Sequence, residues 1–159
     1  MARYSCSVNG MTLSTTADYK TLVTAATGVG SVLGVYEVSL SGEASSSAVA
    51  RTAVNRPSSV GVTIGTPTQT PVKLNPASAA ATFTVAGSAS AVSGWTTQPV
   101  ITADDVLTPT FNAFGGGYRW VFPPDSQIIV GAQGAIANLT FRSRSGTSVV
   151  SGQVLIEEM

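Results

Sequence analysis

The segment GGGYRWVFPPDSQIIV, which runs from Gly115 to Val130, decides the fold of this chain. Its aromatic residues Tyr118, Trp120 and Phe122 fall at every second position, so an extended backbone directs all three side chains to one face. This period of two predicts a strand whose aromatic face is buried beneath a second sheet. Pro123 and the proline that follows cannot donate hydrogen bonds to a sheet, so the chain must leave the sheet before the second strand of this segment begins.

Three other segments show the same alternation of apolar and polar residues. Two of them, Ala135–Arg142 and Ser148–Glu157, close the sequence. The last one is long, rich in β-branched residues and free of proline, so we expect it near the middle of a sheet. The third, Ser31–Leu40, places Glu37 and Ser39 on its polar side, which predicts a strand with one solvated face.

Shorter β-type segments fill the rest of the chain between turns rich in Gly, Pro, Ser and Thr. Ala2–Val8 ends at Asn9-Gly10, a dipeptide typical of tight turns, and Val49–Arg56 ends before a proline. We count about eight to ten short strands and no amphipathic helix of ordinary length. The sequence therefore predicts an all-β single domain over residues 1–159, a jelly-roll-like β-sandwich of antiparallel strands. Residues 1–16 are expected to form an extended arm that either pairs within its own subunit or reaches a neighbour.

Composition points to a protein that docks rather than one that attracts charged polymers. Charged residues make up 10% of the chain, against about 25% in an ordinary soluble domain. A surface of small uncharged groups suits an assembly, because little charge has to be desolvated on docking. The net charge is zero and the six arginines and two lysines are scattered along the sequence, so we expect no nucleic-acid partner. No apolar run is long enough to span a bilayer and Met1–Ser7 lacks the apolar core of a secretory signal, so we expect no membrane partner.

Few residues are suited to catalysis. The chain has no histidine, the commonest general base and metal ligand, and its only cysteine is Cys6, which excludes an intrachain disulfide. Asp104, Asp105 and Glu157 offer carboxylates for glycoside hydrolysis, with aromatic residues such as Trp95 stacking on sugar rings. Solvated loop acids and core aromatics are the more ordinary interpretation of the same residues. We therefore expect neither an enzyme nor a bound cofactor or metal.

Taken as a whole, the chain resembles the small jelly-roll head decoration, or cement, proteins of tailed bacteriophages. The resemblance covers most of the length in order, and its signatures are structural rather than those of an active site. They are the opening strand with Asn9-Gly10, the segments AVARTAVNRP, TPVKLNPASAAATFTVAG and FNAFGGGYRWVFPP, and the ending SGQVLIEEM.

The resemblance implies a non-enzymatic virion protein, made in the host cytoplasm, that binds the outer surface of the major capsid protein lattice between capsomers. Such a protein stabilises the mature head, because contacts repeated over a lattice add through avidity. The resemblance also implies a homo-oligomer, commonly a trimer, with a dimer as the other arrangement. The alternative with the same fold and aromatic content is a carbohydrate- or receptor-binding jelly-roll module of a virion, such as an adhesin or a lectin-like protein.

Candidate contact residues come from polar, irregular segments, because binding loops are usually of this kind. Trp95 is the strongest candidate for an interface anchor, since it follows a glycine outside any clear strand and aromatic residues dominate interface energetics. The full set of candidate contacts with the capsid or with another subunit is Arg3, Tyr4, Glu43, Thr68, Gln69, Trp95, Asp104 and Asp105.

Overall fold

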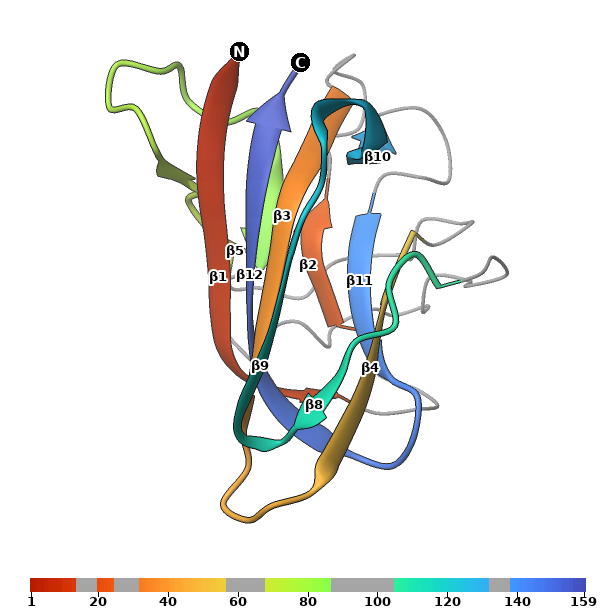
Figure 1. Cartoon of the computed structure of the whole chain (residues 1–159). Coiled ribbons are helices and arrows are strands. Elements are labelled where there is room, and N and C mark those ends of the chain that lie inside the picture. Colours follow the sequence, from red (N-terminus) through yellow and green to blue (C-terminus); the bar gives the residue numbers. More distant parts are fainter. Residues whose placement is uncertain (14–19, 25–31, 57–67, 87–104, 132–137) are drawn as a thin grey trace.

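The chain folds into two antiparallel β-sheets packed face to face in a computed structural model (Figure 1). The structure describes residues 1–13, 20–24, 32–56, 68–86, 105–131 and 138–159. Within these residues lie twelve strands and one short 3-10 helix, and none of them is α-helical. The predicted all-β sandwich is therefore confirmed, although the strands outnumber the predicted eight to ten.

The first sheet, sheet A, has the strand order β10-β3-β12-β1-β6, and β9 also pairs with β3. The C-terminal strand β12 lies between β3 and β1, so the prediction that it occupies the middle of a sheet is confirmed. The bounds of the strands are β1 (Ala2–Leu13), β3 (Val32–Glu43), β6 (Val72–Lys73), β9 (Phe114–Val121), β10 (Ile128–Gly131) and β12 (Ser148–Glu158).

The second sheet, sheet B, has the order β5-β7-β2-β11-β4-β8. The chain passes from sheet B to sheet A between β8 and β9, where Ala113 donates to the carbonyl of Ala48 and accepts from the amide of Ala44. The bounds are β2 (Lys20–Thr24), β4 (Val49–Asn55), β5 (Thr68–Gln69), β7 (Thr84–Ala86), β8 (Thr110–Asn112) and β11 (Asn138–Ser143).

The hydrophobic core lies between the two sheets. Leu139 and Phe141 of β11 and Val154 and Ile156 of β12 are completely buried, as the alternation of their segments predicts. Along β12 every second residue from Ser148 to Ile156 is buried, and apolar burial of this kind is the main source of stability for a sandwich. The largest fully buried side chains are Tyr4, Phe141, Met11, Leu13, Leu33, Leu139, Ile156, Val35, Val38 and Val54.

The N-terminal strand is longer than predicted. The expected turn at Asn9-Gly10 is wrong: β1 continues to Leu13, and the dipeptide forms a bulge between Val8 and Met11, where the register with β12 shifts. Gly10 has φ of 64°, a value that glycine adopts without steric strain and that suits a bulge as well as a turn. Residues 2–13 therefore pair within their own chain, which decides between the two arrangements considered for that part of the arm.

The aromatic strand predicted from Tyr118, Trp120 and Phe122 exists as β9, but its burial was predicted wrongly. Trp120 lies opposite Val38 on β3, so the row shares the inward side of sheet A, yet Trp120 is 47% exposed. The reason is position: among the described strands β9 pairs only with β3, so its side chains have neighbours on one side only. The prolines act as predicted, because a 3-10 turn, η1 (Pro124–Ser126), separates β9 from β10.

Candidate interaction surfaces

The described residues contain no group of three or more His, Cys, Asp or Glu side chains that could hold a metal ion. In that same part of the chain, no helix is long and apolar enough to cross a membrane. The chemically distinctive side chains lie instead on three surfaces, one at the edge of sheet A and one on the outer face of each sheet.

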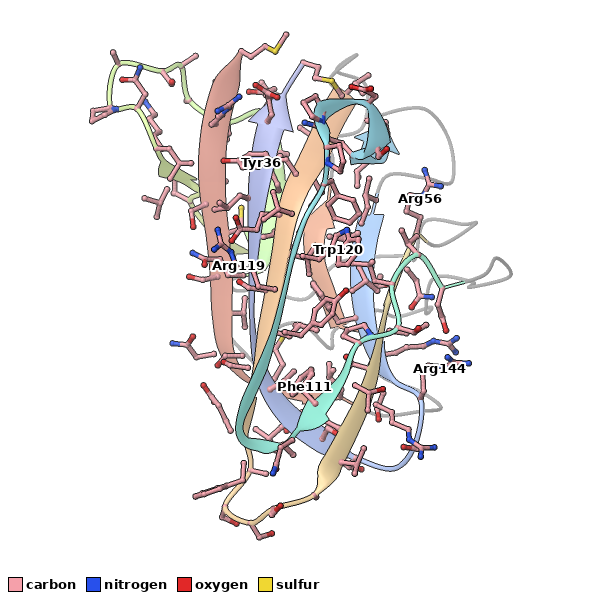
Figure 2. All side chains as sticks on the ribbon, viewed as in Figure 1. Tyr36, Arg56, Phe111, Arg119, Trp120 and Arg144 are labelled. Carbon is pink, nitrogen blue, oxygen red and sulfur yellow. The ribbon has the colours of Figure 1, made fainter. Side chains whose placement is uncertain are left out.

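The first surface is the aromatic row, defined as Tyr118, Trp120 and Phe122 of the β9 edge. The rings of Tyr118 and Trp120 are nearly parallel, with an interplanar angle of 3° and centroids 6.4 Å apart. Trp120 and Phe122 meet edge to face, with centroids also 6.4 Å apart. Tyr118 and Phe122 pack partly against the core, whereas Trp120 is half exposed, on the side of β9 that faces sheet B (Figure 2). The row thus presents an aromatic surface at the edge of sheet A, with the rings of Tyr118 and Trp120 nearly parallel.

The backbone of the same edge can accept another strand. The amide of Phe122 donates to the carbonyl of Tyr36 at 2.8 Å, so in an antiparallel ladder the even-numbered residues of β9 face β3. The N–H and C=O groups of Gly117, Arg119 and Val121 consequently point away from β3. Exposed Val121 adds an apolar side chain to this row, which pairs with no other strand that the structure describes. Such an edge is a template for pairing with a further chain.

The second surface is a row of charges across the outer face of sheet A. Arg119 binds Glu37 through both carboxylate oxygens, at 2.7 and 2.8 Å, and Arg3 binds Glu157 at 3.1 Å. The guanidinium carbon of Arg3 also lies 5.4 Å from the centre of the Tyr36 ring. Hydrogen bonds from Arg119 lower the pKa of Glu37 and outweigh the opposite effect of burial. Glu37 is therefore held in its ionised form by Arg119, and Glu157 lies in an ion pair with Arg3.

A shallow depression of about 280 Å³ lies beside this row. Its floor consists of small polar residues from three neighbouring strands, among them Ser39, Ser151 and Gln153. Gln153 donates to Ser5 at 2.9 Å, while the hydroxyl of Ser151 donates to Glu43 and accepts from the amide of Gly10. Hydroxyl-bearing side chains that hydrogen-bond to one another therefore occupy this part of the outer face of sheet A.

The third surface centres on Asp105, on the outer face of sheet B. Its carboxylate lies 2.7 Å from Arg142 Nη2 and 3.3 Å from Arg144 Nε, and it accepts a hydrogen bond from Asn55 Nδ2. Burial by itself would raise the pKa of Asp105, but the hydrogen bonds from Arg142 and Asn55 and the two arginine charges lower it. Asp105 is thus an ionised anchor between β4 and β11.

The predicted contact residues differ in their exposure to solvent. Arg3 and Glu43 are exposed, and Asp105 is mostly covered by its arginines. Thr68 and Gln69 form β5, at the edge of sheet B, where only their backbone is described. Tyr4 is completely buried: its ring meets Phe83 edge to face and its hydroxyl donates to the carbonyl of Ala79, so it has no surface for a contact.

Two candidates, Trp95 and Asp104, lie outside the described residues. The structure instead indicates Trp120, Arg119 and Arg144 as candidate contacts, and the sequence analysis did not include these residues. The triple glycine before the aromatic strand was a usable signal, because a strand that opens with three glycines packs poorly in a sheet centre. No local signal predicts the partners of the arginines, since ion pairs between strands depend on strand pairing.

Comparison of the chain with protein-family models, with curated proteins and with solved structures finds no match in any of the three. The interpretation of the three surfaces therefore rests on their geometry and on the sequence.

Proposed function

We propose that this chain is a non-enzymatic decoration protein of a phage virion, which binds the outer surface of the major capsid protein lattice between capsomers and stabilises the mature head. The sequence resemblance supplies the class of protein. The observation that carries the proposal is the β9 edge, where a half-exposed Trp120 and exposed Val121 accompany three residues whose outward backbone groups pair with no described strand.

The state of the carboxylates supports binding rather than catalysis. Glu37, Glu157 and Asp105 each lie in an ion pair with an arginine. A general acid needs a carboxyl group that can hold a proton, whereas the arginine partners of Glu37 and Asp105 lower the pKa of these two groups and hold them in the ionised form. Such pairs are ordinary features of a docking surface.

Attachment through an edge strand provides both affinity and direction. Main-chain hydrogen bonds from Gly117, Arg119 and Val121 would align a strand of the coat protein or of a second copy, and Trp120 would cover part of it. A decoration protein that contacts two or more coat subunits adds interface area that must be broken before the shell opens. The same edge is suited to the homo-oligomer, a trimer or a dimer, that the resemblance implies.

Cosedimentation with expanded and unexpanded capsids tests this function, followed by heat or osmotic challenge of the shells with and without the protein. The wild type should sediment with expanded capsids and raise their resistance to rupture. Trp120→Ala should weaken binding about tenfold or more, as loss of an aromatic anchor does. Val72→Ala is the matched control, because Val72 is an exposed apolar residue on β6, at the other edge of sheet A. If the wild type neither binds nor protects the shells, the proposal is rejected.

The alternative function is a carbohydrate- or receptor-binding module of a virion, and one observation favours it. The parallel rings of Tyr118 and Trp120 form a platform of the kind that can stack on the apolar face of a sugar. Binding of the isolated protein to a glycan array, lost in Trp120→Ala and kept in Val72→Ala, would favour this alternative. Capsid binding without any glycan binding would exclude it.

A further inference from the structure

Three arginines gather on the outer face of sheet B. Phe141 and Val54 point into the core, so their neighbours in sequence on β11 and β4 point outward. Arg142 lies opposite Ala53, and the amide of Arg144 donates to the carbonyl of Arg51 at 2.7 Å. We call Arg51, Arg142 and Arg144 the arginine cluster. Figure 2 shows Arg144 on the side of the molecule opposite Arg119, beside β4.

The cluster carries more positive charge than the chain neutralises. Among the described residues, Asp105 is the only acidic residue that forms ion pairs with the cluster. Its carboxylate binds both Arg142 and Arg144. Arg51 is exposed and forms no ion pair in that part of the chain. Three guanidinium groups and one carboxylate give the cluster an excess of two positive charges. The net charge of the whole chain is zero, so this excess is local. Like charges on neighbouring strands are destabilising, so a compensating partner is expected.

The hydrogen-bonding capacity of the cluster is also unfilled. Arg142 Nε is buried and has no hydrogen-bond partner among the described residues, although its Nη2 binds Asp105. Asn55 Oδ1, beside the same carboxylate, is likewise buried and accepts from no donor in that part of the chain. A buried donor without a partner costs free energy, so an acceptor that reached Arg142 Nε would be stabilising. Arg144, whose side chain is 52% exposed, gives access to the cluster.

We propose that the arginine cluster binds a carboxylate-rich segment of a partner protein. Arginine suits this role because its planar guanidinium binds a carboxylate through two hydrogen bonds. In its choice of partner the inference rests on the proposed function, since the acidic segment would then belong to the capsid protein. The cluster and the β9 edge lie on different sides of the sandwich, which would let one molecule contact two coat subunits.

The size of the cluster favours carboxylates over a nucleic acid. Neighbouring strands are about 4.8 Å apart and alternate residues about 7 Å apart, so the cluster spans roughly 10 Å. That span holds one or two carboxylates. Affinity for nucleic acid comes from many phosphate contacts along a backbone, and in the described residues Arg56, which directly follows β4, already donates to the carbonyl of Ile129.

The direct test titrates the 15N-labelled protein with a hexaglutamate peptide and follows the arginine Nε–Hε resonances by NMR. The resonances of Arg51, Arg142 and Arg144 should shift, those of Arg3 should not, and the affinity should fall as salt is raised. Hexaglutamine should cause no shift. Arg51→Gln and Arg144→Gln should each weaken binding about three- to fivefold, the range of an exposed ion pair. Lys73→Gln removes the same charge from an exposed site on β6 and should leave binding unchanged.

Three results would overturn the inference: no shift in the cluster, an equal loss of affinity in Lys73→Gln, or tighter binding of a short single-stranded DNA than of hexaglutamate at the same residues. Capsid cosedimentation of the same variants separates this inference from the proposed function. If the wild type and Arg51→Gln/Arg144→Gln bind capsids equally, the cluster is not the contact and the decoration function stands. If hexaglutamate binds at the cluster but capsids do not bind at all, the decoration function fails and the carboxylate site stands.

Discussion

Arg119 of β9 donates two hydrogen bonds to Glu37 of β3, one of 2.7 Å from Nε to Oε1 and one of 2.8 Å from Nη2 to Oε2. The pair lies on the outer face of sheet A, while Trp120, the next residue, lies on the inward side. The edge strand is therefore held to β3 by side chains as well as by the backbone ladder, and its aromatic row is held in a defined orientation.

Replacing Glu37 with Gln should change the acid stability of the protein. Hydrogen bonds from Arg119 hold the pKa of Glu37 below its ordinary value of 4.5 in the folded state, against the opposing effect of burial. The ion pair thus contributes its full stability above pH 4.5 and loses it as the pH falls through the depressed folded-state pKa. Glu37→Gln should lower the free energy of unfolding at neutral pH and make it less dependent on pH in acid, as measured by urea unfolding.

Glu43→Gln is the control for this experiment, because Glu43 is exposed and forms no ion pair in the described part of the chain. Its effect on the free energy of unfolding at neutral pH should be smaller than that of Glu37→Gln. Equal pH dependence for Glu37→Gln and the wild type would show that the Arg119 pair adds no stability.

Truncation of Phe141 should cost far more stability than truncation of Trp120. Phe141 is completely buried between the sheets, so Phe141→Ala should lower the free energy of unfolding by about 3–5 kcal/mol. Trp120 is half exposed at the β9 edge, and Trp120→Ala should cost about 1 kcal/mol. Urea unfolding of the two variants gives both values. A similar loss for both would mean that Trp120 belongs to the core.

Cys6 should be unreactive while the protein is folded. It lies in β1 within the core, and burial raises the pKa of its thiol to about 12. The reactive thiolate is therefore almost absent at neutral pH, and access is blocked as well. Reaction with a thiol-specific chromogenic reagent should be very slow in native buffer and complete in denaturant. Rapid modification of the native protein would contradict this burial.

Gly42→Ala should disrupt the corner where the chain changes sheets. A Cβ on Gly42 would lie 2.2 Å from the carbonyl oxygen of Ala113, a backbone atom that cannot move without displacing the connection between β8 and β9. We expect a loss of about 1–3 kcal/mol in the free energy of unfolding. Gly117→Ala is the matched control, because its added Cβ would meet only the carbonyl oxygen of Leu40, at 3.4 Å. If both alanines were equally tolerated, the close approach at Gly42 would be disproved.

Much of the fold could be predicted from the sequence, because the period of two is a local property of an extended chain. The faces of β11 and β12 follow directly from the alternation around Phe141 and Val154, and the prolines after Phe122 end their strand as expected. The bulge at Gly10 was missed, because a positive φ serves a turn and a bulge equally and only the paired strand distinguishes them.

The candidate surfaces could not be predicted in the same way. Arg119 and Glu37 are separated by 82 positions, and Arg142 and Asp105 by 37. Their meeting depends on which strands become neighbours and in which register, and a one-residue change of register would move each side chain to the other face. Tyr4 illustrates the converse, since a terminal residue expected at a contact became part of the core once β1 paired along β12.

By itself, the sequence determined that this chain forms strands, where most of them end, and which side chains of each strand share a face. Only the tertiary structure decided that β9 is an edge strand, so that Trp120 is half exposed, and that Arg142 and Arg144 share the carboxylate of Asp105. The physical reason is that alternation specifies the side of a strand on which a residue lies, whereas burial and charge balance depend on what the rest of the chain places against that side.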